Sequence, residues 1–132
     1  MRPPAAHRVV DYRISGPAQA EIDQILDWSW DHFGDLAMRR YFALIRTAIM
    51  DVASDPHRIS VRWVSLSNSE LGLYHLGHSR AHVSHPPGAV QDPRHILVFR
   101  IGVDDVVEIL GLVHDRMLLG KALDRIWQAN QA

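Results

Sequence analysis

Four histidines lie close together in the middle of the chain, at His75, His78, His82 and His85. Imidazoles with spacings of three, four and three residues align on one side of a helix, where they could bind Zn²⁺ or Ni²⁺. Gly77 and the Pro86-Pro87 pair oppose a helix at this point, and no carboxylate lies inside the cluster. We therefore expect neither a physiological metal site nor a cofactor.

Carboxylates recur at every fourth residue farther upstream, at Asp23, Asp27, Asp31 and Asp35. Residues 17–35 contain no Lys or Arg. Like charges at this helical spacing repel one another by about 0.2–0.5 kcal/mol per pair, so the pattern does not stabilise an isolated helix. The stretch is either a solvated face that arginines from elsewhere in the fold compensate, or a docking edge for a basic segment of a partner.

These carboxylates belong to a pair of amphipathic helices predicted over residues 17–54. Apolar residues recur at three- and four-residue steps on both sides of Gly34, which is the periodicity of one helix face. Gly34 suits the left-handed backbone that ends many helices, and Asp55-Pro56 stops the second helix. The expected inward-facing residues are Ala18, Ile22, Ile25, Leu26, Ser29, Phe33, Ala37, Tyr41, Leu44, Ile45, Ala48, Ile49 and Val52.

Apolar runs outside this helical hairpin predict strands. An N-terminal strand is expected at residues 9–15, after a flexible arm at residues 1–8. Another strand is expected at residues 59–66. Ile59 and Trp63 should lie on one side of it, because alternate residues of a strand share a face.

Two β-branched runs at residues 95–101 and 106–114, separated by a Gly/Asp cluster, are the strongest hairpin signal in the chain. A short strand at residues 71–78 and an exposed, Pro-rich loop at residues 79–93 are expected before them. Helical spacing returns at residues 117–127, which predicts a short C-terminal helix.

The order of elements predicts one α+β domain over residues 1–132. It has an N-terminal strand, an α-helical hairpin, an antiparallel sheet of three to four strands within residues 59–116, and a C-terminal helix. The chain has no cysteine, and its 14 Lys and Arg nearly balance its 15 Asp and Glu, so no general attraction to nucleic acid or membrane is expected. It shows neither a secretory signal nor an apolar run of the ~18 residues that span a bilayer, so we expect a cytoplasmic protein.

The order and spacing of several short motifs resemble the RelE/ParE superfamily of bacterial toxins, and the ParE branch most closely. The resemblance spans about Val10 to Leu123. The motifs that carry it are Tyr12-Arg13-Ile14, Pro17-Ala18, Ile22-Asp23-Gln24-Ile25, Phe33-Gly34, Tyr41, Leu44, Asp55-Pro56, His78-Ser79-Arg80, Pro93 to Arg100, Val107 to Leu110 and Val113 to Met117.

The resemblance implies the toxin of a type II toxin–antitoxin module with a RelE/ParE-like fold. A ParD-like antitoxin would neutralise it by wrapping around it, and contact with DNA would come only through the antitoxin complex. ParE toxins are understood to inhibit DNA gyrase by binding, which requires no catalytic residue. On this hypothesis the target surface consists of Arg94, Arg100, Arg116, Lys121 and Trp127, and the antitoxin contacts Asp23, Asp27, Trp30, Asp31 and Tyr41.

The alternative is a ribosome-dependent mRNA endonuclease of the RelE type. RNA cleavage needs a base for the 2′-hydroxyl, an acid for the leaving oxygen and cations for the phosphate. The candidates for these roles are Arg80, His95, Arg100 and His114. The same side chains would be structural if the histidines form hydrogen bonds at strand ends and the arginines pair with Asp104, Asp105, Glu108 or Asp115.

Two tryptophans of the first helix are expected in different environments. Trp28 lies near the apolar stripe and should be in the core. Trp30 falls nearer the outside, where either it is partly buried against the C-terminal helix or a partner such as the antitoxin covers it.

Overall fold

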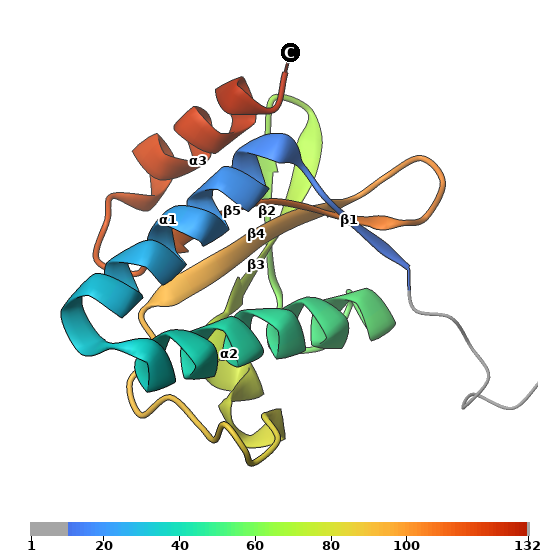
Figure 1. Cartoon of the computed structure of the whole chain (residues 1–132). Helices are drawn as coiled ribbons and strands as arrows, with labels where there is room; N and C mark the ends of the chain where they lie inside the picture. The colour runs from blue at the N-terminus through green and yellow to red at the C-terminus, as the bar shows by residue number, and fades with distance from the viewer. Residues whose placement is uncertain (1–10, 132) are drawn as a thin grey trace, which may run out of the picture.

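A computed structural model describes residues 11–131. The expected arm at residues 1–8 and the first two residues of the expected N-terminal strand lie outside this range. The elements are β1 (Tyr12–Ile14), α1 (Gly16–Phe33), α2 (Asp35–Ser54), β2 (Arg62–Leu66), β3 (Ser69–His75), the 3-10 helix η2 (Leu76–His82), β4 (His95–Ile101), β5 (Val107–His114) and α3 (Leu119–Ala129) (Figure 1).

The five strands form one mixed sheet in the order β1-β5-β4-β3-β2. Strands β2 to β5 are antiparallel neighbours, whereas β1 lies at the edge and runs parallel to β5. The predicted α+β fold is therefore confirmed, with four antiparallel strands after the helical hairpin and the N-terminal strand as a fifth member of the sheet.

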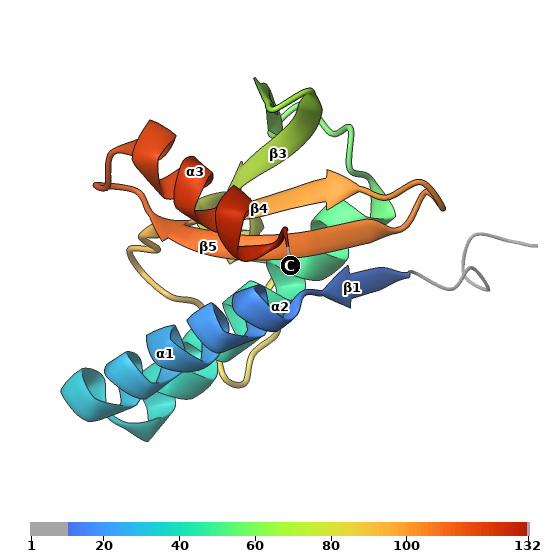
Figure 2. The same ribbon diagram turned by 90° about the horizontal axis from the view of Figure 1, so that it is seen from above.

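Helices cover both faces of the sheet (Figures 1 and 2). Helices α1 and α2 enclose the larger core with one face, where Leu44 packs with Tyr74 and Phe99. Helix α3 encloses a smaller core on the other face, where Ile126 packs with Leu110. Strands β4 and β5 are therefore buried over their central residues, whereas Trp63 and Val64 of β2 pack against the two cores while only partly buried.

The helical hairpin forms where its local signals predict it. The Ser15 hydroxyl accepts a hydrogen bond from the Ala18 N–H at 3.2 Å, which caps α1. Gly34 has φ +88° and donates its N–H to the Trp30 carbonyl at 2.9 Å, so the turn uses a backbone that favours glycine. Helix α2 ends at Ser54, directly before Asp55.

Three local expectations were wrong. Trp28 and Phe33 are 55% and 68% exposed because the turn end of the hairpin extends past the sheet (Figure 2). Ile59 lies in a turn before β2 and is fully exposed. The stretch 79–93 is not a loop throughout, because η2 runs to His82 and Ser79 is buried.

Ser79 is buried because two polar groups bind it. Its hydroxyl lies 2.7 Å from the Tyr74 hydroxyl and donates to Asp51 Oδ2 at 2.5 Å. The His82 Nδ1 atom lies 2.8 Å from the same carboxylate oxygen. These contacts attach η2 to α2. They join residues about 30 positions apart, so the sequence alone did not predict them.

Candidate functional site

Strand β4 places the predicted functional side chains on opposite faces of the sheet. His95 shares a face with Leu97 and Phe99, which pack under α1 and α2. Arg100 shares the other face with Val98, which packs under α3. The sequence already indicates this separation, because residues at odd and even positions of one strand point to opposite faces.

At the first end of β4, His95 lies beside His114 of β5, with ring centroids 5.3 Å apart. The Tyr41 hydroxyl accepts the Arg94 N–H at 3.3 Å, so its own proton is left to donate to His95 Nδ1 at 2.5 Å. His114 Nδ1 accepts the Arg116 N–H at 3.1 Å. Both histidines are therefore hydrogen-bonded rim residues, as the structural interpretation of the sequence predicted.

The pKa values of His95 and of Tyr41, which are hydrogen-bonded to each other, are both shifted away from neutral pH. Burial, with the neighbouring His114 as a smaller cause, lowers the pKa of His95 from 6.5 to about 4. Burial raises the pKa of Tyr41 to about 12. Efficient acid–base catalysis needs a pKa near the working pH, so neither group is tuned for proton transfer at pH 7.

The lowered pKa of His95 predicts a pH-dependent stability. The unfolded chain binds a proton at His95 below pH 6.5, whereas the folded chain does so only near pH 4. The neutral, buried imidazole of His95 therefore costs no stability above pH 6.5, and the free energy of unfolding falls by roughly 3 kcal/mol as the pH drops toward 4. The Asp115 carboxylate has a pKa below its usual 3.8, so its own loss of stability begins only at lower pH.

Urea unfolding of a His95→Gln variant between pH 7.5 and 4.5 tests this expectation. The variant should show a flatter dependence of the free energy of unfolding on pH than the wild type. His57→Gln is the matched control, because it removes an exposed histidine that lies outside the hydrogen bond between Tyr41 and His95. Equal slopes for wild type and His95→Gln would contradict the prediction.

Asp115 organises a second polar group at the same end of the sheet. Its Oδ2 atom lies 3.0 Å from His75 Nε2, and its Oδ1 atom lies 3.1 Å from Arg94 Nη2. The hydrogen bond from His75 is the main cause that lowers the pKa of Asp115. Asp115 thus holds the Arg94 guanidinium in place, and the Arg94 side chain is one-third exposed (33%), as is that of Arg100.

The four clustered histidines serve different partners. His75 uses Nε2 for Asp115 and accepts the Gly77 N–H on Nδ1 at 2.9 Å, while His82 binds Asp51. Residues 11–131 contain no group of three or more His, Asp or Glu side chains placed to hold a metal ion.

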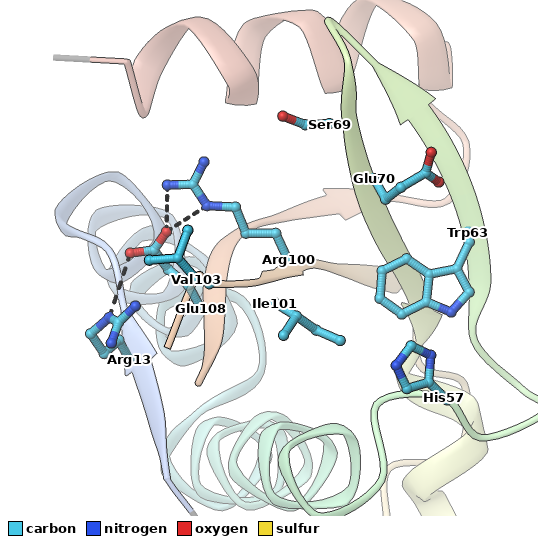
Figure 3. Close-up of a pocket in the computed structure, with 10 residues that line it drawn as sticks. Arg13, His57, Trp63, Ser69, Glu70, Arg100, Ile101, Val103 and Glu108 are labelled. Atoms are coloured by element: carbon cyan, nitrogen blue, oxygen red, sulfur yellow. Dashed lines mark hydrogen bonds and ion pairs between the residues drawn. The ribbon is translucent and has the colours of Figure 1, made fainter. Parts of the chain in front are cut away.

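At the other end of β4, Arg100 lies in a network of charges (Figure 3). Its Nη2 and Nε atoms lie 2.7 and 2.8 Å from Glu108 Oε1. Glu108 Oε2 is 3.8 Å from Arg13 Nε, and Arg13 also binds Asp104 at 2.7 Å. The Arg100 guanidinium carbon lies 5.8 Å from the ring centroid of Trp127 on α3, so it is held between a carboxylate and an indole.

A hollow of about 670 Å³ opens beside Arg100 (Figure 3). Pairing between β3 and β4 stops at Gly72 and Phe99, so the two strands diverge beyond that point. The Trp63 ring, stacked on His57 at 5.3 Å, forms one wall. The sequence predicts Trp63 on a strand face but contains no local signal for this hollow. The lining residues are Arg13, His57, Trp63, Ser69, Glu70, Arg100, Ile101, Gly102, Val103 and Glu108.

The other target-binding and catalytic candidates are scattered. Arg116 and Lys121 are exposed, at the turn before α3 and in its first turn. Arg80 is exposed on η2 and donates to the Val90 carbonyl at 2.6 Å. Of the residues proposed for target binding, the structure brings only Arg100 and Trp127 into direct contact.

The acidic helix presents most of the residues proposed for antitoxin binding. Within residues 11–131, Asp27 and Asp31 have no hydrogen-bond or ion-pair partner, and Asp23 accepts only from Gln19 at 3.0 Å. Trp30 is 51% exposed, as expected. Tyr41 does not belong to this surface, because its hydroxyl points to the β4–β5 hairpin.

These features define a small α+β protein whose exposed charges and aromatic side chains suit the recognition of other macromolecules. A family model described as the ParE toxin of the type II toxin–antitoxin system, parDE, matches residues 12–119, and the chain belongs to this family. The family implies that an antitoxin is its partner in a toxin–antitoxin pair. A comparison with curated proteins gave no match. Each helix within residues 11–131 is too short or too polar to cross a bilayer.

Proposed function

We propose that this ParE-family toxin inhibits DNA gyrase in the cytoplasm by binding it, and that a ParD-like antitoxin neutralises it. The separation of His95 from Arg100 is the observation that carries this choice. The two side chains leave opposite faces of β4 and stand five residues apart, which is roughly 16 Å at the rise of a strand. One phosphate could not contact both, whereas a binding inhibitor needs no such convergence.

The pair of Arg100 and Trp127 supports a target surface at this end of the α3 face. Arginine and tryptophan are enriched among residues that dominate binding energies. The guanidinium is fixed by Glu108 and lies over the indole, so little conformational entropy is lost when a partner covers it. Lys121 extends the same surface along α3, and Arg94 and Arg116 lie at its far end.

The outer side of α1 supports the antitoxin site. Asp27 and Asp31 are exposed without partners among residues 11–131, and Trp30 adds an apolar anchor between them. A basic antitoxin segment with an apolar side chain would complement this surface. The toxin would then contact DNA only through the antitoxin complex.

Supercoiling by purified gyrase with ATP, with and without the toxin, tests the proposal. We expect inhibition with trapped, cleaved DNA, relieved by the antitoxin encoded with the toxin. Unchanged supercoiling, together with arrested translation and cut messenger RNA in a cell extract, would replace the proposal with the RelE-type endonuclease.

A double variant separates these two mechanisms at the residue level. His95→Ala with His114→Ala should leave inhibition of gyrase within about twofold of wild type, because neither imidazole lies on the proposed target surface. An endonuclease that used these groups for proton transfer would lose about 100-fold or more in rate. The assay is run at pH 7.5, and circular dichroism verifies that the variant is folded.

A further inference from the structure

The outer side of α2 carries an apolar stripe that the fold does not use. Helix α2 faces the sheet with Leu44, Ile45, Ala48, Ile49 and Val52. On its outer side Phe42 and Met50 are 48% and 39% exposed. They line a groove between α2 and the segment after η2. The groove is lined by Arg39, Phe42, Ala43, Arg46, Thr47, Met50, Asp51, His82, Val83, Ser84, Pro86 and Pro87.

This groove is basic along α2. Among residues 11–131, Arg46 has no carboxylate partner, and Arg39 has only its helical neighbour Asp35 at 3.0 Å. Both members of that pair are more than half exposed, so their interaction is weak and easily exchanged. An acidic helix with a large apolar side chain would therefore complement the groove.

Helix α1 of a second copy has the required chemistry. Its outer side carries Asp23, Asp27 and Asp31 together with the exposed Trp30, and residues 17–35 include no Lys or Arg. Because α1 and α2 pack side by side, the outer face of the hairpin is acidic on one helix and basic on the other (Figures 1 and 2).

The two sets of charges also match in register. The helices run antiparallel from Gly34, so residues equally distant from it lie at about the same level. Asp31 and Arg39 stand three and five residues from Gly34, and Asp23 and Arg46 stand 11 and 12 residues from it. At a rise of about 1.5 Å per residue, the members of each pair differ in level by roughly 3 Å or less.

We propose that two copies of the toxin associate through the outer faces of their helical hairpins. Helices α1 and α2 diverge from their shared turn (Figure 1), and a two-fold axis along their bisector places α1 of one copy over α2 of the other and keeps each residue at its level. Asp31 then meets Arg39 of the second copy and Asp23 meets Arg46, twice per dimer. Trp30 and Phe42 stand four and eight residues from Gly34, so they differ in level by roughly 6 Å, and Trp30 lies nearest the Phe42 end of the apolar stripe. Within residues 11–131 of one chain, these carboxylates and arginines form no ion pair with each other.

The area that the two helical hairpins can bury against each other indicates a weak dimer. Two helices of 18 and 20 residues cover roughly 500 Å² per copy, or about 1,000 Å² in total, at the lower limit of specific interfaces. The dimer is therefore weak, reversible and sensitive to salt. Dimerisation is a property beyond the proposed inhibition of gyrase. The dimer interface and the proposed antitoxin site share Trp30 and the carboxylates of α1, so the second copy and the antitoxin compete for them.

Sedimentation equilibrium of the full-length toxin alone tests the proposal with two charge variants. Asp23→Arg with Asp31→Arg places arginine on both sides of every proposed contact, and Arg39→Asp with Arg46→Asp places aspartate on both sides. Each variant alone should dimerise at least tenfold more weakly than wild type, because like charges then meet at every contact. An equimolar mixture of the two should associate as strongly as wild type, because each helix again meets its opposite charge. Arg62→Glu, on β2, is the control and should not change dimerisation.

The proposal is overturned if the wild type remains a monomer at low salt and high micromolar concentration. It is also overturned if either charge variant dimerises as well as wild type, or if the mixture fails to associate. Circular dichroism verifies that each variant is folded. Because neither gyrase nor antitoxin is present, failure here leaves the proposed function untouched.

Discussion

A Gly72→Val substitution is expected to lower the free energy of unfolding by about 3 kcal/mol. A Cβ atom at position 72 would lie 2.4 Å from Phe99 Cζ and 2.6 Å from its Cε1 atom. The ring cannot move aside, because Phe99 is fully buried and packs edge-on against Trp63 at 5.4 Å. Gly72 also pairs with Trp63 and Phe99 across both neighbouring strands, so relief requires β3 to separate from β4.

Urea denaturation measures this loss, with Gly120→Ala as the matched control. Nothing lies within 4 Å of a Cβ at Gly120 in α3, and alanine has a better helix propensity. The control should therefore be as stable as wild type or slightly more stable, by up to about 0.5–1 kcal/mol. A Gly72→Val protein with the midpoint of wild type would show that Phe99 has room to move.

Replacing Trp127 with alanine is expected to weaken the inhibition of gyrase by about 30-fold, which corresponds to roughly 2 kcal/mol. The indole supports the Arg100 guanidinium from one side while Glu108 holds it from the other. Its removal takes away an aromatic contact and also frees Arg100, so the partner must order that side chain on binding. The effect should appear as a higher concentration of toxin for half-inhibition of supercoiling.

Trp28→Ala is the control for Trp127→Ala. Trp28 is 55% exposed at the turn end of the helical hairpin, away from α3, and its loss should change inhibition by less than about twofold. Trp127 also packs against the smaller core, so near-UV circular dichroism and binding of the antitoxin are measured to show that the variant is folded. Equal inhibition by both variants and wild type would remove α3 from the target surface.

Local signals in the sequence determined the helical hairpin and the β4–β5 hairpin. Ser15 caps α1, Gly34 supplies the left-handed turn, and Asp55-Pro56 ends α2. Each of these acts through residues at most a few positions away, and the apolar periodicity between them tells which side of each helix is buried. The spacing of the same motifs carried the resemblance to ParE toxins, which the family match over residues 12–119 confirms.

Only the tertiary structure decided which part of each helix and strand is covered by another element. Periodicity placed Trp28 near the apolar stripe of α1 but could not show that this part of the helix extends past the sheet. The parallel pairing of β1 with β5 joins residues about 95 positions apart, as Tyr12 with Val107, and no local pattern encodes it.

The same limit applies to the candidate sites. Strand alternation in the sequence already places His95 and Arg100 on opposite faces. The shifted pKa of His95, however, arises from burial under Tyr41 of α2, and the support of Arg100 comes from Trp127 of α3. Burial and charge contacts depend on atoms that are near in space and distant along the chain, so these properties arise only when the helices pack on the sheet.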